Sequence, residues 1–290
     1  MEKSKVYFIK NITNESLIKI YKALNIELKG KVAIKISTGE PGGNNYLKPN
    51  LIKDLVNLLN GTIVECNTAY EGKRFKSIDH WKAIKEHGFL DIAPCDIMDE
   101  EGEIELPIKN GKRISKNYVG SHIKNYDSML ILSHFKGHAM GGFGGALKNM
   151  SIGIASSHGK AYIHGSGEEE HIWDGDHDSF LESMADACSS IIDYFGSNNL
   201  AYINVMNNLS IDSDCDNNPH TPEMKDIGIL ASLDPVALDK ACYDMIKNSN
   251  DPKKDSLIER MDSRNSIHTV EQAYEENLGN IEYEIINIEQ

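Results

Sequence analysis

The sequence predicts an α/β protein with a mostly parallel sheet of Rossmann-like β-α units, arranged as two lobes around a cleft. Short β-branched runs alternate with segments whose apolar residues recur at helical spacing, as in 31–36, 49–59, 62–66 and 77–87. Loops rich in glycine and polar residues follow several of the runs. A length of 290 residues suits one large domain or two smaller ones.

Each element has a local signal. The runs 31–36 and 62–66 are rich in β-branched residues and predict strands. A helix is expected at 49–59, with a proline in its first turn, and another at 180–195, with Ser179 as N-cap and Gly196 at its end. The same patterns predict strands at 6–9, within 118–133 and at 201–205, 227–231 and 283–288, and helices at 15–24, 77–87, 235–247, 255–261 and 270–278.

The regular alternation of strands and helices stops in the acidic, glycine-rich segment 91–117, where we expect an irregular hairpin. We therefore treat 1–290 as one domain, with lobes at 1–100 and 118–290. A single compact domain with an inserted hairpin is the alternative.

Composition narrows the classes of function. The formal net charge of −14 argues against nucleic acid and anionic membranes as partners and favours a small-molecule ligand. No apolar run is long enough for a transmembrane helix, and the apolar core of the first residues is too short for a signal peptide, so we expect a cytoplasmic protein. The five cysteines contain no CxxC pair, which disfavours an intrinsic iron–sulfur cluster.

The segment 133–160, SHFKGHAMGGFGGALKNMSIGIASSHGK, carries most of the candidate chemistry. Seven of the 11 histidines fall between His122 and His177. Histidine transfers protons near neutral pH and binds metals, so His134 and His138 are candidate acid–base residues. Lysines near glycine backbone N–H groups suit a phosphate or carboxylate, which makes candidates of Lys136, Lys148 and Lys160. Surface exposure is the alternative for each of these side chains.

Two further loops leave the carboxyl ends of predicted parallel strands and are expected to face the same crevice. The loop after 31–36 contains Glu40, and the loop after 62–66 contains Asn67 and Arg74. Arg74 can bind a carboxylate or phosphate through two nitrogens. His80 begins the next helix and could orient a ligand.

Candidate metal ligands come from two segments. His158 and His164 flank Gly159-Lys160 and could converge on one metal ion. Asp214 and Cys215 offer a hard and a soft ligand, although turn chemistry explains the aspartate equally well.

Four segments together resemble the domain of unknown function 362 family, whose members are often described as iron–sulfur-cluster-binding or ferredoxin-like proteins. They are KVAIKISTGEPGGNNYLKP, NTAYEGKRFKSIDHWKAIKEHGF, SHFKGHAMGGFGGALKN with the residues up to Lys160, and DIGILASLDPVALDKACYD. Many members carry a ferredoxin-type cysteine insert after the position of Lys160. This chain has YIHGSGEEEHIWDGDHD there, so the resemblance implies a relative without its own cluster, and a cluster supplied by a separate ferredoxin stays open.

A shorter resemblance is to lactate racemase and its relatives, which use a nickel-pincer nucleotide. It rests on His138, the glycine-phenylalanine segment after it and Lys148. It implies that His138 is a proton-transferring base, that Lys148 contacts the cofactor and that His164 binds the metal, with His80 as a loose match to a second histidine. Apart from this resemblance, glycines let the backbone approach a ligand closely, and ligand contacts are expected from the glycine-rich segment at Gly141, Gly142, Gly144, Gly145 and Asn149.

Three functions remain open. The first is a metal- or cofactor-dependent enzyme of racemase or isomerase type, or an oxidoreductase, that acts on a small anionic metabolite. Nickel, iron and zinc are the candidate metals. The second is a redox partner without its own cluster, and the third is a non-catalytic binder of a metal or ligand. The oligomeric state stays open.

Overall fold

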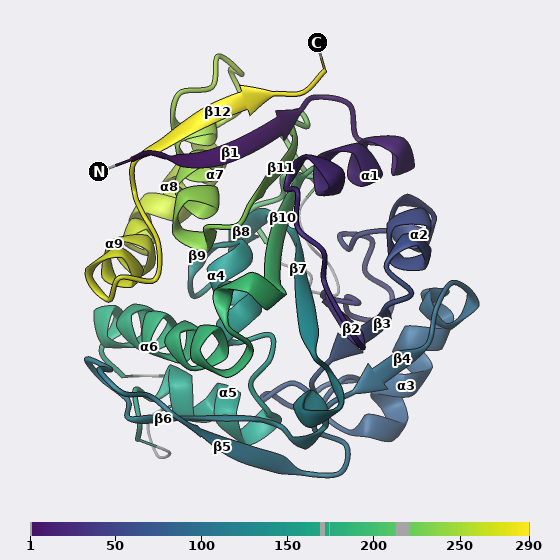
Figure 1. The fold of residues 1–290 in the computed structure, drawn as a ribbon. Helices are drawn as coiled ribbons and strands as arrows, with labels where there is room; N and C mark the ends of the chain where they lie inside the picture. Colours follow the sequence, from purple (N-terminus) through teal and green to yellow (C-terminus); the bar gives the residue numbers. More distant parts are fainter. Residues whose placement is uncertain (1, 169–171, 174, 213–220, 290) are drawn as a thin grey trace.

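An eight-stranded sheet runs through the molecule (Figure 1). A computed structural model describes residues 2–168, 172–173, 175–212 and 221–289. The strands of the sheet lie in the order β12-β1-β11-β10-β7-β2-β3-β4. Their bounds are Ser4–Ile9 (β1), Val32–Lys35 (β2), Thr62–Glu65 (β3), Cys95–Ile97 (β4), Ser128–His134 (β7), Leu200–Met206 (β10), Gly228–Ser232 (β11) and Tyr283–Asn287 (β12).

The sheet is mixed and mostly parallel, which confirms the predicted α/β class. Strands β10, β7, β2, β3 and β4 are parallel to one another, and only β11 pairs antiparallel with both of its neighbours. Because strands from 1–100 and from 118–290 belong to this one sheet, the two ranges share a core. The division into lobes stays a prediction.

Helices cover both faces of the sheet. Along β7, Met129 and Ile131 pack into the core under α4, α6 and α7, while Leu130 and Leu132 pack into the core under α1, α2 and α3. This alternation follows from the two-residue period of a strand. The helices are α1 (Asn14–Ala23), α2 (Pro49–Leu58), α3 (Ser77–Glu86), α4 (Ala146–Ser151), α5 (Ser157–His164), α6 (His177–Phe195), α7 (Pro235–Lys247), α8 (Asp255–Ser263) and α9 (Ile267–Glu275), with 3-10 turns η1 (Phe89–Asp91), η2 (Ser121–Asn125) and η3 (Ser197–Asn199).

Helix ends follow the capping residues, with one correction. Helix α7 begins after Asp234, whose side chain accepts the backbone N–H of Ala237, and α6 ends at Gly196, as predicted. The prediction of Ser179 as the N-cap of α6 is wrong. The N-cap is Asp176, whose carboxylate accepts the backbone N–H of Ser179 and adds one turn to the helix.

Two hairpins lie outside the main sheet. Strands β5 (Glu103–Pro107) and β6 (Lys116–Gly120) form the hairpin expected within 91–117, although β6 extends beyond that range. Strands β8 (Lys136–His138) and β9 (Gly142–Gly144) form a second antiparallel pair where a glycine loop was expected. Gly142 has φ +76°, and a Cβ there would lie 2.4 Å from Cβ of Ser266, so the turn into β9 requires glycine.

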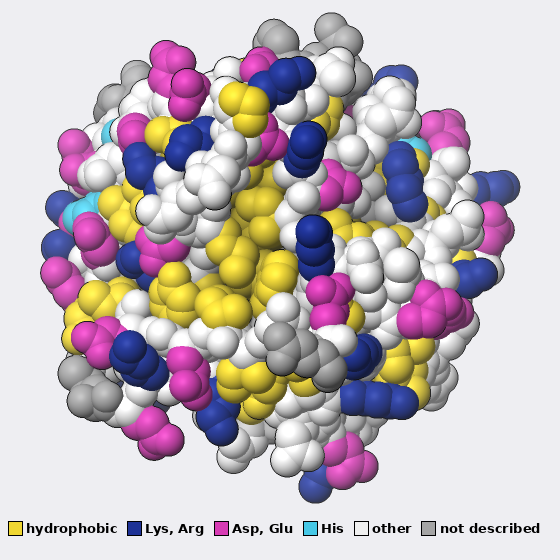
Figure 2. Space-filling view, turned by 90° about the horizontal axis from the view of Figure 1, so that it is seen from above, with side chains coloured by type: hydrophobic (Ala, Val, Ile, Leu, Met, Phe, Trp, Pro, Cys, Tyr) yellow, Lys and Arg dark blue, Asp and Glu magenta, His cyan; other side chains and the backbone are white. Residues whose placement is uncertain are grey.

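None of the described helices is long and apolar enough to cross a membrane. Viewed from above, the surface carries both signs of charge, with hydrophobic side chains gathered near the centre of this face (Figure 2).

Candidate functional site

A cavity of about 600 Å³ lies at the carboxyl ends of β2, β3 and β7. From β2 the chain continues through α2 to β3 on one side, whereas from β7 it continues through α4 to α6 to β10 on the other side. Because the two connections diverge, the cavity lies beyond the carboxyl ends of β2 and β7. Open α/β sheets bind ligands at such switch points.

A buried network of charges forms one wall of the cavity. Lys35 ends β2 and Glu65 ends β3, and their side chains form an ion pair of 3.2 Å. Nε of Arg74 donates to Glu40 at 2.8 Å, and Nη1 of Arg74 lies 3.5 Å from Glu65. Backbone and side chain of Thr38 also donate to Glu65. Each buried carboxylate therefore has a cation beside it, as burial requires.

These contacts set the charges of the network. Burial alone would raise the pKa of Glu65, but Lys35 and Arg74 hold it at about 2. Burial lowers the pKa of Lys35, and the pairing with Glu65 opposes this. Burial raises the pKa of the neighbouring Cys66, so the cavity holds a thiol there rather than a reactive thiolate.

Asn149 joins the carboxyl ends of β2 and β7 at the switch point. Its side-chain nitrogen donates to the carbonyl oxygens of Lys35 at 3.1 Å and Leu132 at 3.4 Å, and to the Ser133 hydroxyl at 3.1 Å. One side chain of α4 therefore bridges the carboxyl ends of β2 and β7, whose last paired residues are Lys35 and Ile131.

Helix α4, which carries Lys148 and Asn149, is fixed at its first turn by a distant carboxylate. Asp239 of α7 accepts the backbone N–H groups of Ala146 at 2.8 Å and Leu147 at 2.9 Å. The side chain of Asn204 donates to the same carboxylate at 2.7 Å. These bonds place Lys148 at the cavity.

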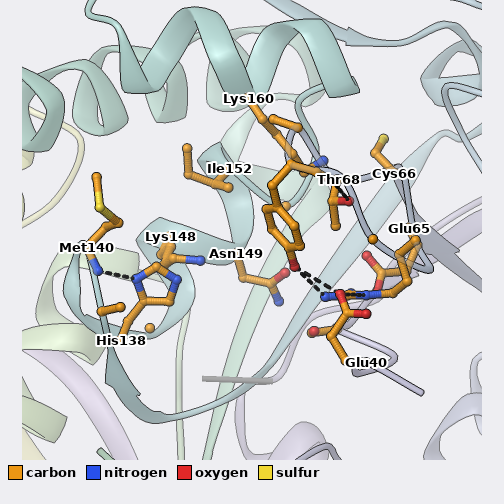
Figure 3. A pocket seen from close by; sticks show the side chains of 18 of the residues that line it. Glu40, Glu65, Cys66, Thr68, His138, Met140, Lys148, Asn149, Ile152 and Lys160 are labelled. Atoms are coloured by element: carbon orange, nitrogen blue, oxygen red, sulfur yellow. Dashed lines mark hydrogen bonds and ion pairs between the residues drawn. The ribbon is translucent and has the colours of Figure 1, made fainter. Parts of the chain in front are cut away.

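His138 is neutral and presents an N–H to the cavity. Its Nδ1 accepts the backbone N–H groups of Met140 at 3.1 Å and Gly141 at 3.0 Å, so the proton of the neutral ring sits on Nε2. Burial, with Lys148 and Lys136 close by, holds the pKa of His138 well below its usual range. Figure 3 shows the second ring nitrogen turned toward the side on which Lys148 and Asn149 lie.

His164, at the end of α5, carries its proton on the other ring nitrogen. Its Nδ1 lies 2.7 Å from the carbonyl oxygen of Lys160, and a carbonyl can only accept, so Nδ1 carries the proton. Burial lowers the pKa of His164 to about 4, although the bond to Lys160 opposes this. The ring stacks on Phe180 at 4.5 Å between centroids. His164 therefore offers a lone pair on Nε2 and lines the cavity.

His134 has another role. Its Nδ1 lies 2.7 Å from the carbonyl oxygen of Asn45, and its Nε2 lies 2.6 Å from the carbonyl oxygen of Asn207. The ring thus joins the loops that follow β2 and β10, and both nitrogens already contact backbone. This geometry favours a structural role over the predicted acid–base role.

Lys160 is a buried lysine whose side chain reaches the cavity. It is 8% exposed, and its nitrogen donates to the carbonyl oxygen of Ala155 at 2.6 Å. Within the described part of the chain, no carboxylate forms an ion pair with it.

The structure brings most of the predicted site residues together. The cavity is lined by Glu40, Arg74, His134, Lys136, His138, Gly144, Gly145, Lys148, Asn149, Lys160 and His164. Gly141 lies in the turn of the adjoining hairpin and Gly142 begins β9, outside the cavity lining. Asn67 and His80 pair with each other at 3.1 Å and also lie outside the cavity lining.

The predicted metal ligands are not assembled in the part of the chain that the structure describes. His158 lies six residues before His164 on α5 and contacts Glu103 at 2.8 Å, outside the cavity lining. Asp214 and Cys215 lie outside the described residues. In the described ranges, no group of three or more histidine, cysteine, aspartate or glutamate side chains could hold a metal ion.

Sequence reasoning missed Lys35, Glu65, Cys66 and Asp239. The first three lie inside the predicted strands 31–36 and 62–66. Because a parallel strand is covered on both faces, a charged side chain near its end was a usable signal for Lys35 and Glu65. Asp239 is 93 and 92 residues from the two N–H groups that it accepts, so no local sequence pattern indicates these bonds.

The fold and the cavity define an α/β protein with a cation-rich cavity at a topological switch point of its sheet. The chain belongs to the family described as domain of unknown function (DUF362), whose model matches residues 32–244. This confirms the family resemblance seen in the sequence. No curated protein matches the chain.

Two solved structures are similar at low identity. The lactate racemase apoprotein from Thermoanaerobacterium thermosaccharolyticum has a TM-score of 0.41 and 18% identity, covering 70% of this chain and 50% of that one. A protein from Thermotoga maritima has a TM-score of 0.48 and 12% identity, covering 81% of this chain and 60% of that one. This chain therefore spans half to three-fifths of the length of these two proteins.

Proposed function

We propose that this protein is an enzyme that binds a small anionic metabolite in the cavity and moves a proton on it with histidine, as racemases and isomerases do. The observation that carries the proposal is that two buried neutral histidines of one cavity carry their protons on different ring nitrogens. Nε2 of His164 is an acceptor, whereas Nε2 of His138 is a donor. Such a pair supplies a base and an acid at the same pH.

The surrounding lysines suit an anionic substrate. Lys136, Lys148 and Lys160 line the cavity of a protein whose formal net charge is −14. Positive groups in a buried cavity attract an anion and stabilise negative charge that develops on it. A local positive site inside an acidic protein also selects its ligand by charge.

The proposed reaction balances without an oxidant. Nε2 of His164 takes a proton from a carbon beside a carboxylate or carbonyl group, and the electron pair of the C–H bond moves into an enolate. The enolate oxygen accepts a hydrogen bond from Nε2–H of His138 and is stabilised by the nearby ammonium groups. Delivery of a proton to the opposite face of the same carbon completes a racemisation, and delivery to the neighbouring carbon completes an isomerisation.

Metal ligation by His164 is compatible with the same geometry. Metal-binding histidines usually donate their other N–H to a carbonyl or carboxylate, as Nδ1 of His164 does. Among the described residues no set of three such ligands comes together, and the proposed proton transfer uses only side chains of the protein.

Deuterium exchange tests the proposal whatever the product of the reaction is. The protein is incubated in D2O with a panel of carboxylic acids that carry a C–H beside the carboxylate or a carbonyl, and loss of that proton is followed by NMR. We expect His164→Ala to slow exchange by about 10²- to 10⁴-fold. His122, which pairs with Asp96 outside the cavity lining, gives the matched control His122→Ala, with unchanged exchange. Equal rates in wild type and His164→Ala would contradict the proposal.

A further inference from the structure

The cavity is larger than a small metabolite needs. Sites of about 300–1,000 Å³ hold drug-sized ligands, and this cavity measures about 600 Å³. A three- or four-carbon acid bound beside Lys148 would leave much of that space to water. The size therefore points to a ligand that reaches beyond the histidines.

The polar groups of the cavity are divided between two ends. Figure 3 shows His138 and Lys148 on one side, Asn149 and Ile152 between, and Lys160 with Thr68 on the other side. Because the apolar side chain of Ile152 lies between the two ends, beside Asn149, it favours a carbon segment in the middle of a ligand that spans the cavity.

The end formed by Lys160 has more positive charge than its contacts neutralise. Arg74 and Lys35 already have Glu40 and Glu65 as partners. Among the described residues, Lys160 has only a backbone carbonyl, at 2.6 Å. Burial lowers the pKa of Lys35, and the nearby charge of Lys160 lowers it further. A buried ammonium with no carboxylate partner is costly unless a ligand supplies the negative charge.

We propose that the ligand carries two anionic oxygen groups, carboxylate or phosphate, one bound at the His138 and Lys148 end and the other bound by Lys160. This rests on the proposed function and names the class of its substrate. Lys160 is the anchor for the group that does not react, and binding at that end positions the reacting carbon at His164 and His138.

Calorimetric titration with matched acids tests the proposal. The pairs are butyrate with succinate, valerate with glutarate and hexanoate with adipate, so that each diacid has the same number of carbons as its monoacid. We expect at least one diacid to bind about ten- to hundredfold more tightly than its partner. Lys160→Met removes this gain and leaves monoacid affinity, whereas Lys85→Met, at an exposed position of α3, changes neither.

The outcomes separate this inference from the proposed function. One outcome would overturn the two-group ligand alone. In it, monoacids bind, Lys148→Met weakens their binding, and diacids bind no more tightly than their matched monoacids. Failure of monoacids and diacids alike would overturn both. Thermal melting without ligand checks that Lys160→Met is folded, and Lys160→Gln is a second variant that must lose the diacid gain in the same way.

Discussion

Lys35 and Glu65 form an ion pair of 3.2 Å between the last residues of two neighbouring parallel strands, where both are almost fully buried. Such a pair loses much hydration and contributes little net stability. It fixes a charged wall at the carboxyl ends of β2 and β3, against which Arg74 is also placed. The pair is therefore best understood as part of the site.

Removal of one partner should destabilise the protein. Glu65→Gln leaves Lys35 buried without its carboxylate, and we expect a loss of about 3–5 kcal/mol in the free energy of unfolding. The double variant Lys35→Met/Glu65→Gln removes both charges and should recover part of that loss. Urea denaturation of the wild type, both single variants and the double variant gives the coupling energy. Additive effects of the two substitutions would contradict a direct interaction.

The same pair predicts a dependence of stability on acid. The pKa of Glu65 is about 2 in the folded protein and about 4.5 in the unfolded chain, so the folded state binds fewer protons between these values. Its contribution is complete above about pH 4.5 and is lost as the pH falls toward 2. Across this range, the free energy of unfolding should change less steeply with pH in Glu65→Gln than in the wild type. An identical slope would show that Glu65 does not titrate this way.

The sequence was sufficient for most of the elements, although not for β4, β8, β9 and α5, and it was not sufficient for their partners. Strands and helices were predictable because apolar periodicity is local, and the candidate residues of 133–160 were found because glycine, histidine and lysine are concentrated there. The order of strands and the cap from Asp239 depend on tertiary contacts. His164 ends α5, a helix for which the sequence analysis found no periodic signal.

His164 should act as a base well below neutral pH. Burial lowers its pKa to about 4, so Nε2 is unprotonated from about pH 5 upward. Exchange catalysed by His164 should therefore rise as the pH increases through about 4 and stay level to pH 7, apart from any ionisation of the substrate. The pH profile of the deuterium exchange rate is the measurement. A rise centred near 6.5 would mean that the ring is exposed to water in the working protein.

Gly145 should not tolerate a side chain. A Cβ at this position would lie 2.4 Å from Oδ1 of Asp239, which cannot move because Ala146, Leu147 and Asn204 all donate to that carboxylate. We expect Gly145→Ala to lower the free energy of unfolding by about 1–3 kcal/mol.

The control for that substitution is Gly72→Ala, measured by the same denaturation experiment. The added Cβ would meet only Tyr70, at 3.6 Å, and Gly72 lies on the exposed loop. Its effect should stay within about 0.5 kcal/mol. If Gly145→Ala lowers the free energy of unfolding no more than Gly72→Ala does, Asp239 moves to make room for the methyl group.

The opposite tautomers of His138 and His164 are directly measurable by nitrogen-15 NMR of the imidazole rings. In His138 two backbone N–H groups point at Nδ1, so we expect an unprotonated Nδ1 and a protonated Nε2 at neutral pH. In His164 the carbonyl of Lys160 requires the reverse assignment. His138→Ala and His164→Ala assign the signals. If both rings carry the proton on the same nitrogen, the cavity does not hold the acceptor and donor that proton transfer requires, and one of the two histidines must have another role.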